Sequence, residues 1–177
     1  MNPEIFDNFL DNDIFKEMQQ VILGSQFPWR FNEYILHSEL DKHKKVFQFT
    51  HSLYKEYNPS SKLCSVIDPI LEIIHPIAIY RIKANLRTRT TNIEESDYHV
   101  DFTDFGNNQE KLKQWTTSIF YMNTNDGYTK FEDGSKVESV ANRLVTFTSN
   151  MKHLGTSCTD ESKRVVINFN YFSKYSL

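Results

Sequence analysis

The chain has 177 residues, and its 20 basic and 23 acidic side chains give a net charge of -3. This length suits one domain, so we expect residues 1–177 to form a single domain. The negative charge argues against general nucleic-acid binding through a basic surface. The two cysteines, Cys64 and Cys158, form no C-x-x-C pair, which argues against a zinc ribbon or a disulfide framework and favours a reducing compartment.

Targeting and membrane signals are weak along this sequence. The first residues, Met1–Asp7, lack the basic region and apolar run of a signal peptide. The longest apolar cluster, Ile70–Ile74, is short and interrupted by a glutamate, so no membrane span is expected. We therefore expect a soluble, cytoplasmic protein with no membrane partner. The 14 Phe and 9 Tyr, against only 5 Gly, favour sheets and a pocket with aromatic walls.

Residues 1–76 have mostly helical periodicity and predict a helical N-terminal layer. Three helices are expected, at residues 12–24, 38–57 and 62–74, after a short entry strand at residues 5–10. Asn12 or Asp13 would cap the first helix, and Pro69 would kink or restart the third.

After residue 76 the pattern changes to a period of two. Eight strands are expected, at residues 77–87, 98–102, 115–123, 128–132, 136–140, 143–149, 155–158 and 164–172. Short strands with turn signals between them indicate a sandwich or barrel. The predicted fold class is therefore α+β, mainly β, with a barrel supported by the N-terminal helices. Polar segments at residues 88–97 and 103–114 flank one strand and are candidates for binding loops that order with substrate.

The clearest candidate for chemistry is His99-Val100-Asp101, followed by His153. Residues two apart on a strand point to the same side, so His99 and Asp101 can bind one ion together. His153 follows the expected strand at residues 143–149, where a barrel could bring it back. Two imidazoles and one carboxylate on one face of a metal leave three positions open. This suits non-haem Fe(II) and oxygen, because zinc normally closes its sphere at four ligands.

Arg164 begins the last expected strand, eleven residues after His153. An arginine at the closed end of a barrel is suited to bidentate binding of a carboxylate. The residues expected on its face are Val166, Asn168 and Asn170. Two asparagines inside a barrel indicate a site, since buried polar groups need partners.

In order and spacing, these motifs resemble the 2-oxoglutarate and Fe(II)-dependent oxygenases, particularly the prolyl-4-hydroxylase-like branch. The matching pieces are Tyr98–Phe102, Thr117–Asn123, Tyr128–Glu132, Arg143–Phe147, His153 and Arg164–Phe172. The resemblance covers residues 77–172 and implies that they form a double-stranded β-helix, or jelly-roll, core. It also implies an Fe(II) dioxygenase that couples oxidative decarboxylation of 2-oxoglutarate to hydroxylation of a substrate C–H bond, with a prolyl or other peptidyl residue as the favoured target.

The resemblance also implies roles for individual residues. His99, Asp101 and His153 would be the metal ligands and catalytic centre, with Fe(II), 2-oxoglutarate and O2 as cofactor and cosubstrates. Arg164 would bind the distal carboxylate of 2-oxoglutarate, assisted by Tyr121. Tyr80 is a second candidate for that carboxylate.

Two features leave alternatives open. The Tyr-x-x-Gly-x-x-Tyr lead that often precedes H-x-D in the family is absent, which leaves the substrate class open between a peptide and a small molecule. Lys163 competes with Arg164, because some relatives use a lysine at this distance from the second histidine. The alternative functions are a cupin-like metal or small-molecule binding module without turnover, and a nucleic-acid dealkylating oxygenase, which the lack of a basic stripe near the loops disfavours.

Overall fold

The computed structural model describes residues 3–36, 46–102 and 108–173. The strands are β1 (Glu4–Phe6), β2 (Arg30–Asn32), β3 (Gln48–Lys55), β4 (Asn58–Pro59), β5 (Ala78–Thr88), β6 (Thr116–Tyr121), β7 (Tyr128–Phe131), β8 (Lys136–Glu138), β9 (Arg143–Thr148), β10 (His153–Gly155) and β11 (Lys163–Phe172). The helices are α1 (Asn12–Ile22), the 3-10 helix η1 (Cys64–Ile67), α3 (Asp68–Ile74) and α4 (Gln109–Leu112).

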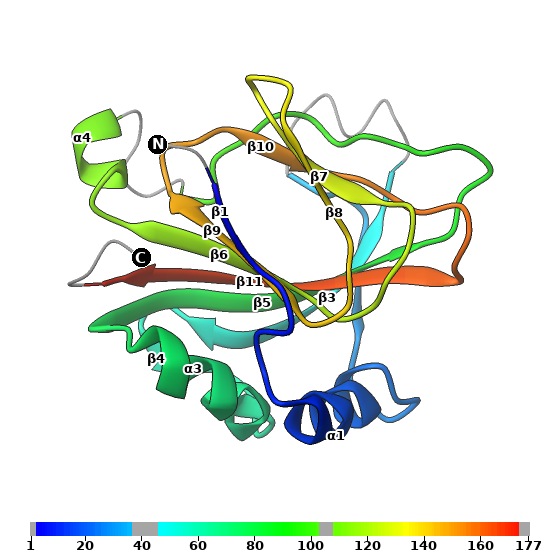
Figure 1. Ribbon diagram of the computed structural model, residues 1–177, viewed down its shortest axis with the longest axis horizontal. Coiled ribbons are helices and arrows are strands. Elements are labelled where there is room, and N and C mark those ends of the chain that lie inside the picture. The colour runs from blue at the N-terminus through cyan, green and yellow to red at the C-terminus, as the bar shows by residue number, and fades with distance from the viewer. Residues whose placement is uncertain (1–2, 37–45, 103–107, 174–177) are drawn as a thin grey trace.

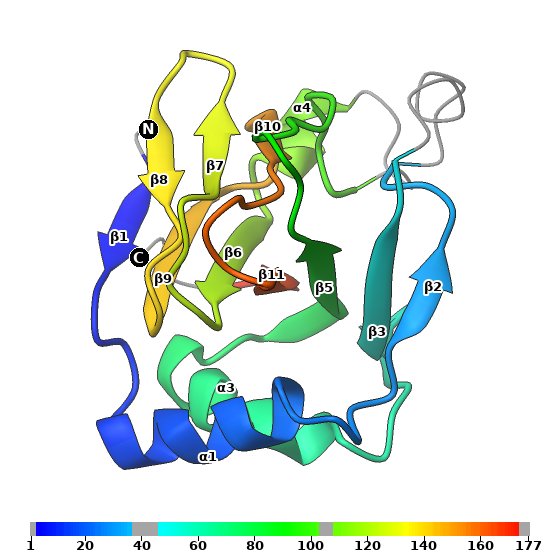
Figure 2. The same ribbon diagram turned by 90° about the vertical axis from the view of Figure 1, so that its right-hand side faces the viewer.

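The described strands form two antiparallel sheets. The large sheet has the order β1-β9-β6-β11-β5-β3-β2, with β4 paired to β3, and the small sheet has the order β10-β7-β8. Helices α1 and α3 lie on one side of the large sheet and the small sheet lies on the other, as Figures 1 and 2 show. The expected α+β, mainly β architecture is confirmed. No helix in the described part of the chain is long and apolar enough to cross a membrane.

The large sheet packs against the helices through one face. Along β11, Val165, Ile167 and Phe169 join the core beneath the sheet. Helix α1 contributes Phe15, Met18 and Ile22 to the same core, in the spacing of one helical face. Its N-cap is Asp11, whose carboxylate accepts from the Asp13 amide at 2.9 Å, in place of the expected Asn12 or Asp13.

A second core lies between the two sheets. It contains Ile119, Tyr121, Phe131, Val137, Val145, Phe147 and Val166. Because neighbouring residues of a strand point to opposite faces, β11 contributes to both cores. The period-two reading of residues 77–172 therefore predicted most of the barrel correctly.

The prediction that residues 1–76 form a mostly helical layer is wrong over part of that range. Strands β2, β3 and β4 lie there and extend the large sheet beyond β5. Residues 48–55 were expected in a helix but form β3, because their backbone pairs with β5. The first part of that expected helix, residues 38–45, lies outside the described residues.

Two smaller predictions also need correction. Residues 98–102 form no extended strand; their pairing is a single antiparallel bridge between His99 and His153. The strand expected at residues 155–158 instead begins at His153, as β10. The segment at residues 88–97 is tied to the chain near Cys158, where the amide of Thr90 donates to the Cys158 carbonyl at 3.0 Å.

Candidate functional site

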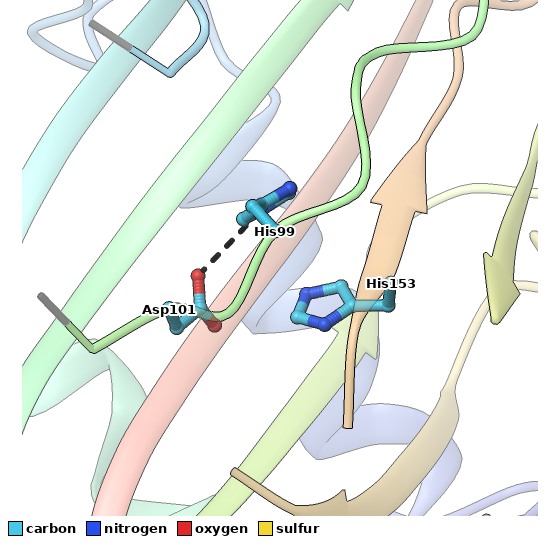
Figure 3. A group of neighbouring side chains, drawn as sticks. All are labelled: His99, Asp101 and His153. Carbon is cyan, nitrogen blue, oxygen red and sulfur yellow. Dashed lines mark ion pairs between the residues drawn. The ribbon is translucent and has the colours of Figure 1, made fainter. Parts of the chain in front are cut away.

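The two histidines of the predicted triad are joined through their main chains. The amide of His99 donates to the carbonyl of His153, and the amide of His153 donates to the carbonyl of His99, both at 3.0 Å. This bridge places the ring centroids 4.8 Å apart and brings Asp101 beside them (Figure 3). One potential ligand atom from each of the three residues lies within 4.8 Å of the others. The predicted grouping of His99, Asp101 and His153 is therefore present in the structure.

The hydrogen bonds of the two rings leave one nitrogen of each available as a ligand. Nδ1 of His99 faces the carbonyl of Asp97 at 3.0 Å, and Nδ1 of His153 faces the carbonyl of Met151 at 3.2 Å. A ring nitrogen that faces a carbonyl carries the proton, so Nε2 keeps its lone pair. Nε2 of His153 is buried and has no hydrogen-bond partner among the described residues. A buried acceptor of this kind beside a carboxylate fits a metal ligand.

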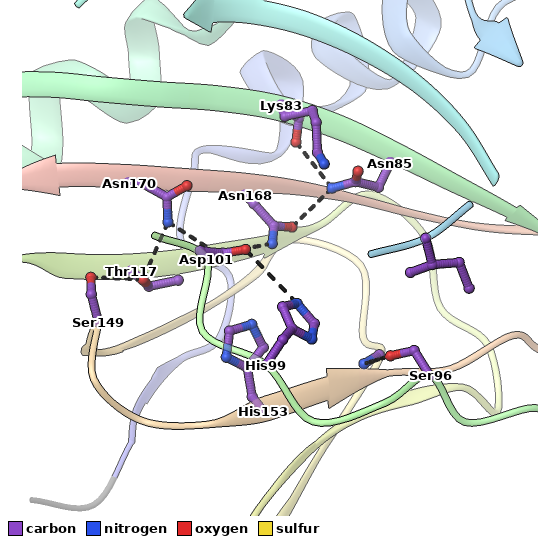
Figure 4. A network of polar contacts seen from close by, with 12 residues as sticks. Lys83, Asn85, Ser96, His99, Asp101, Thr117, Ser149, His153, Asn168 and Asn170 are labelled. Carbon is purple, nitrogen blue, oxygen red and sulfur yellow. Dashed lines mark hydrogen bonds and ion pairs between the residues drawn. The ribbon is translucent and has the colours of Figure 1, made fainter. Parts of the chain in front are cut away.

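Asp101 is held by donors from two strands. Nη2 of Arg81 donates to both its main-chain carbonyl and its Oδ1 at 3.1 Å. On β11, Nδ2 of Asn170 donates to Oδ2 at 3.0 Å and Nδ2 of Asn168 at 3.4 Å (Figure 4). The two asparagines thus face the site as the sequence predicted. Supporting hydrogen bonds of this kind fix the orientation of a ligating carboxylate.

The charges in the triad suit metal ligation. Burial alone would raise the pKa of Asp101, but the Arg81 guanidinium, followed by His153 and His99, holds that pKa well below its usual range. Burial lowers the pKa of His153 to about 4, and the neighbouring His99 adds to the effect. Asp101 is therefore ionised and His153 neutral near pH 7, which are the forms that bind metal.

The triad lines a cavity of about 570 Å³ that also contains Arg164. The Arg164 side chain is 4% exposed. Its Nε donates to Ser139 Oγ at 2.7 Å and its Nη2 to Thr129 Oγ1 at 3.3 Å. Among the described residues, no carboxylate forms an ion pair with it. A buried cation without a counterion, at the edge of a cavity, is suited to binding an anionic ligand.

Tyr121 lies next to Arg164, as expected. The guanidinium carbon is 5.6 Å from the centre of the Tyr121 ring. Tyr121 Oη donates to Thr129 Oγ1 at 2.8 Å, so the tyrosine and the arginine share this acceptor. Thr129 is a residue that the sequence analysis did not identify. In both of these contacts the Thr129 oxygen is the acceptor, so its hydroxyl hydrogen can still be donated to a ligand.

The alternatives to Arg164 and Tyr121 lie elsewhere. Lys163 points to the opposite side of β11, where its Nζ donates to the carbonyl of Leu23 at 3.0 Å. Tyr80 is at the point where the β5–β11 register shifts. Its ring stacks on Phe102 at 4.9 Å, and it does not line the cavity. Neither residue is placed to contact a ligand held by Arg164.

Strand β5 directs a set of charged and polar side chains into the cavity that were not predicted from the sequence. These are Arg81, Lys83, Asn85 and Arg87. They alternate with Ile82, Ala84 and Leu86, which pack in the core beneath the large sheet. The period-two alternation in the sequence places these four residues on one face of β5, but only the placement of the neighbouring strands shows that this face lines a cavity.

Comparison with known proteins gives structural matches only. The chain matches no protein-family model and no curated protein sequence. A prolyl hydroxylase from Trichoplax adhaerens, solved with a peptide of the hypoxia inducible factor oxygen degradation domain, is similar with a TM-score of 0.67 and 14% identity over 96% of this chain and 83% of that one. A Pseudomonas putida prolyl-4-hydroxylase gives a TM-score of 0.59 and 13% identity, over 97% and 92% of the two chains.

A third similar structure holds ligands. HygX from Streptomyces hygroscopicus, with nickel, 2-oxoglutarate and hygromycin B bound, gives a TM-score of 0.60 and 8% identity, over 98% of this chain and 83% of that one. These likenesses show that the protein has the jelly-roll fold of 2-oxoglutarate and Fe(II)-dependent oxygenases, which confirms the expected fold.

Proposed function

We propose that this protein is a non-haem Fe(II) dioxygenase that couples oxidative decarboxylation of 2-oxoglutarate to hydroxylation of a substrate C–H bond. The observation that carries the proposal is the sharing of one cavity by the His99, Asp101 and His153 cluster and by Arg164. The cluster supplies two imidazoles and a carboxylate, and Arg164 supplies a buried cation with no carboxylate partner among the described residues. The fold likeness to oxygenases of this class supports the same conclusion.

His99 Nε2, His153 Nε2 and an oxygen of Asp101 would hold the metal. Three protein ligands on one side leave the other positions of an octahedral ion for cosubstrate and oxygen. When bound, iron with 2-oxoglutarate supplies oxygen activation, as the cosubstrate is converted to succinate and carbon dioxide. Arg81, Asn168 and Asn170 orient Asp101 for this role.

Arg164 would bind the distal carboxylate of 2-oxoglutarate. Its guanidinium is fixed by Ser139 and Thr129, so little rotamer entropy remains to be lost when a carboxylate binds. Tyr121 supports this position through Thr129. We assign neither Lys163 nor Tyr80 to the cosubstrate.

The primary substrate is a peptide or a small molecule in this proposal. The similar structures include one with a peptide and one with hygromycin B bound. The free thiols of Cys64 and Cys158 support a reducing compartment such as the cytoplasm.

The test is conversion of 2-oxoglutarate by the purified protein. Protein loaded with Fe(II) is expected to release carbon dioxide from 2-oxoglutarate labelled at C1, and a panel of peptides and small polar metabolites is screened for a stimulating substrate. Release should require both iron and oxygen. Tight metal and 2-oxoglutarate binding with no release under any of these conditions would favour a binding module without turnover.

A further inference from the structure

The cavity continues from the metal cluster along a wall formed by β5 and β3. Lys83 on β5 lies in register with Ser52 on β3 and with Asn168 on β11. One row further, Asn85 pairs with Thr50 and with Val166. All of these residues line the cavity, and all but Val166 are polar. The wall is therefore polar, and it lies beside the Asp101 network (Figure 4).

Positive charge dominates the lining. The described lining residues include the cations Lys55, Arg81, Lys83, Arg87 and Arg164, against the single carboxylate Asp101. Three of these cations have acidic partners. Arg81 pairs with Asp101 at 3.1 Å, Arg87 with Glu94 at 3.3 Å and Lys55 with Glu56 at 3.5 Å.

Lys83 differs from those three. Within the described ranges, no carboxylate forms an ion pair with its ammonium group, although the residue is partly buried. Burial lowers the pKa of Lys83 to about 8, and the positive charge of Arg81 contributes further, while the negative charge of Asp101 partly opposes both effects. A desolvated cation without a counterion is costly, and an anion in the cavity would remove that cost.

Asn85, two residues from Lys83 on β5, has a buried side-chain oxygen without a hydrogen-bond donor among the described residues. Its Nδ2 donates to Asn168 Oδ1 at 3.2 Å and to the main-chain carbonyl of Lys83 at 3.3 Å. Its Oδ1 is the acceptor that needs an N–H or O–H donor, and a ligand in the cavity can supply one.

We propose that Lys83 is a specificity-determining residue that pairs with an anionic group, a carboxylate or a phosphate, on the primary substrate. Asn85 Oδ1 accepts a hydrogen bond from an amine or hydroxyl of the same molecule. The substrate class is therefore a polar anionic small molecule with a neighbouring donor, as in an amino acid, a hydroxy acid or a phosphorylated alcohol. This inference rests on the proposed function, since Arg164 is reserved for the cosubstrate.

The anion site can be tested without turnover. Protein is loaded with Ni²⁺ in place of iron and saturated with 2-oxoglutarate, so that Arg164 is occupied. Its melting temperature is then measured against increasing acetate, inorganic phosphate or, as an uncharged probe, acetamide, at constant ionic strength with chloride. A ligand that binds only the folded protein raises the melting temperature according to its dissociation constant.

The expected result is stabilisation of the wild type by acetate or by phosphate, but not by acetamide. The more effective anion distinguishes a carboxylate from a phosphate substrate. Lys83→Met should weaken binding of that anion by at least about tenfold, as expected for loss of a charge-assisted pair. Lys83→Arg should retain most of the effect. The matched control is Lys16→Met, because Lys16 is an exposed lysine on α1 paired with Asp13, and it should respond as the wild type does.

The proposal would be overturned if the anion raised the melting temperature of Lys83→Met as much as that of the wild type. It would also be overturned if neither anion raised the melting temperature of the wild type. Failure of the protein to bind Ni²⁺ or 2-oxoglutarate in the loading step would contradict the proposed function instead. The two failures are therefore distinguishable.

Discussion

A methyl group at Gly127 would lie 2.6 Å from Cδ of Arg164. The same position is 2.6 Å from the carbonyl of Ser157 and 2.8 Å from Oδ1 of Asn125. The main chain at residue 127 therefore packs directly against the arginine stem, and only a residue without a side chain fits. Gly127 lies in the connection between the strands expected at residues 115–123 and 128–132, and it also determines where the guanidinium lies.

Gly127→Ala is therefore expected to displace Arg164 and to weaken 2-oxoglutarate binding about tenfold, with metal affinity nearly unchanged. The measurement is calorimetric titration of the Ni²⁺-loaded protein with 2-oxoglutarate. Gly155→Ala is the matched control, since its added carbon would lie 3.6 Å from Arg164 Nη1, an ordinary contact. Equal affinities in both variants would show that the arginine position does not depend on Gly127.

Arg164→Ala should weaken 2-oxoglutarate binding roughly ten- to a hundredfold, because it removes a charge-assisted pair. Lys163→Ala should have a much smaller effect, since Lys163 points to the opposite face and contacts Leu23. Both variants are titrated with 2-oxoglutarate after metal loading. If Lys163→Ala proves the more damaging change, the assignment of the cosubstrate to this face of β11 is wrong.

Asp101→Ala should abolish iron-dependent 2-oxoglutarate turnover and reduce metal affinity by more than the roughly 10–100-fold typical for loss of a supporting residue. Metal affinity is followed by calorimetry and folding by circular dichroism. Asp13→Ala removes an exposed carboxylate on α1 and is the control. Full turnover in Asp101→Ala would exclude the proposed metal cluster.

Arg81 orients Asp101 but is not itself a metal ligand, so Arg81→Met should weaken metal binding indirectly, through Asp101. Loss of the two 3.1 Å hydrogen bonds leaves the carboxylate less firmly oriented, so metal affinity should fall roughly 10–100-fold. Arg81→Lys keeps the charge and should restore part of the affinity. A merely structural role would instead lower the melting temperature of both variants and leave the metal affinity of the folded fraction unchanged.

The metal-free protein should lose stability as the pH falls from 7 to 5. The pKa of His153 is lowered from 6.5 to about 4 in the folded protein, so across this range the unfolded chain takes up a proton that the folded protein excludes. The expected loss is about 2 kcal/mol of unfolding free energy. Urea unfolding at both pH values, for the wild type and His153→Gln, measures it. The same pH dependence of the unfolding free energy in both proteins would show that it does not come from His153.

The sequence predicted the barrel well where one strand face is apolar and the other polar. Val165, Ile167 and Phe169 alternate with Arg164, Asn168 and Asn170 along β11, and this pattern indicated which face of the strand bears the site. The grouping of His99, Asp101 and His153 followed from the same strand logic, although His99 forms only an isolated bridge to His153 and residues 98–102 form no continuous strand.

Long-range pairing explains what the sequence did not predict. Residues 48–55 also have an apolar spacing compatible with a helix, and only their hydrogen bonds to β5 select the strand. Arg81 and Lys83 were hidden for a related reason. A charged side chain on a strand is equally compatible with solvent and with a cavity until the neighbouring strands are placed.

The reciprocal hydrogen bonds between His99 and His153 close a loop of more than fifty residues that contains β6, β7 and β9. Closing such a loop costs chain entropy, so the meeting of the three ligands depends on the folding of the strands between them. A metal ion bound there would act as a late cross-link between distant parts of the chain. Slower unfolding on metal loading would then report on the assembly of the whole barrel, and not only on occupancy of its centre.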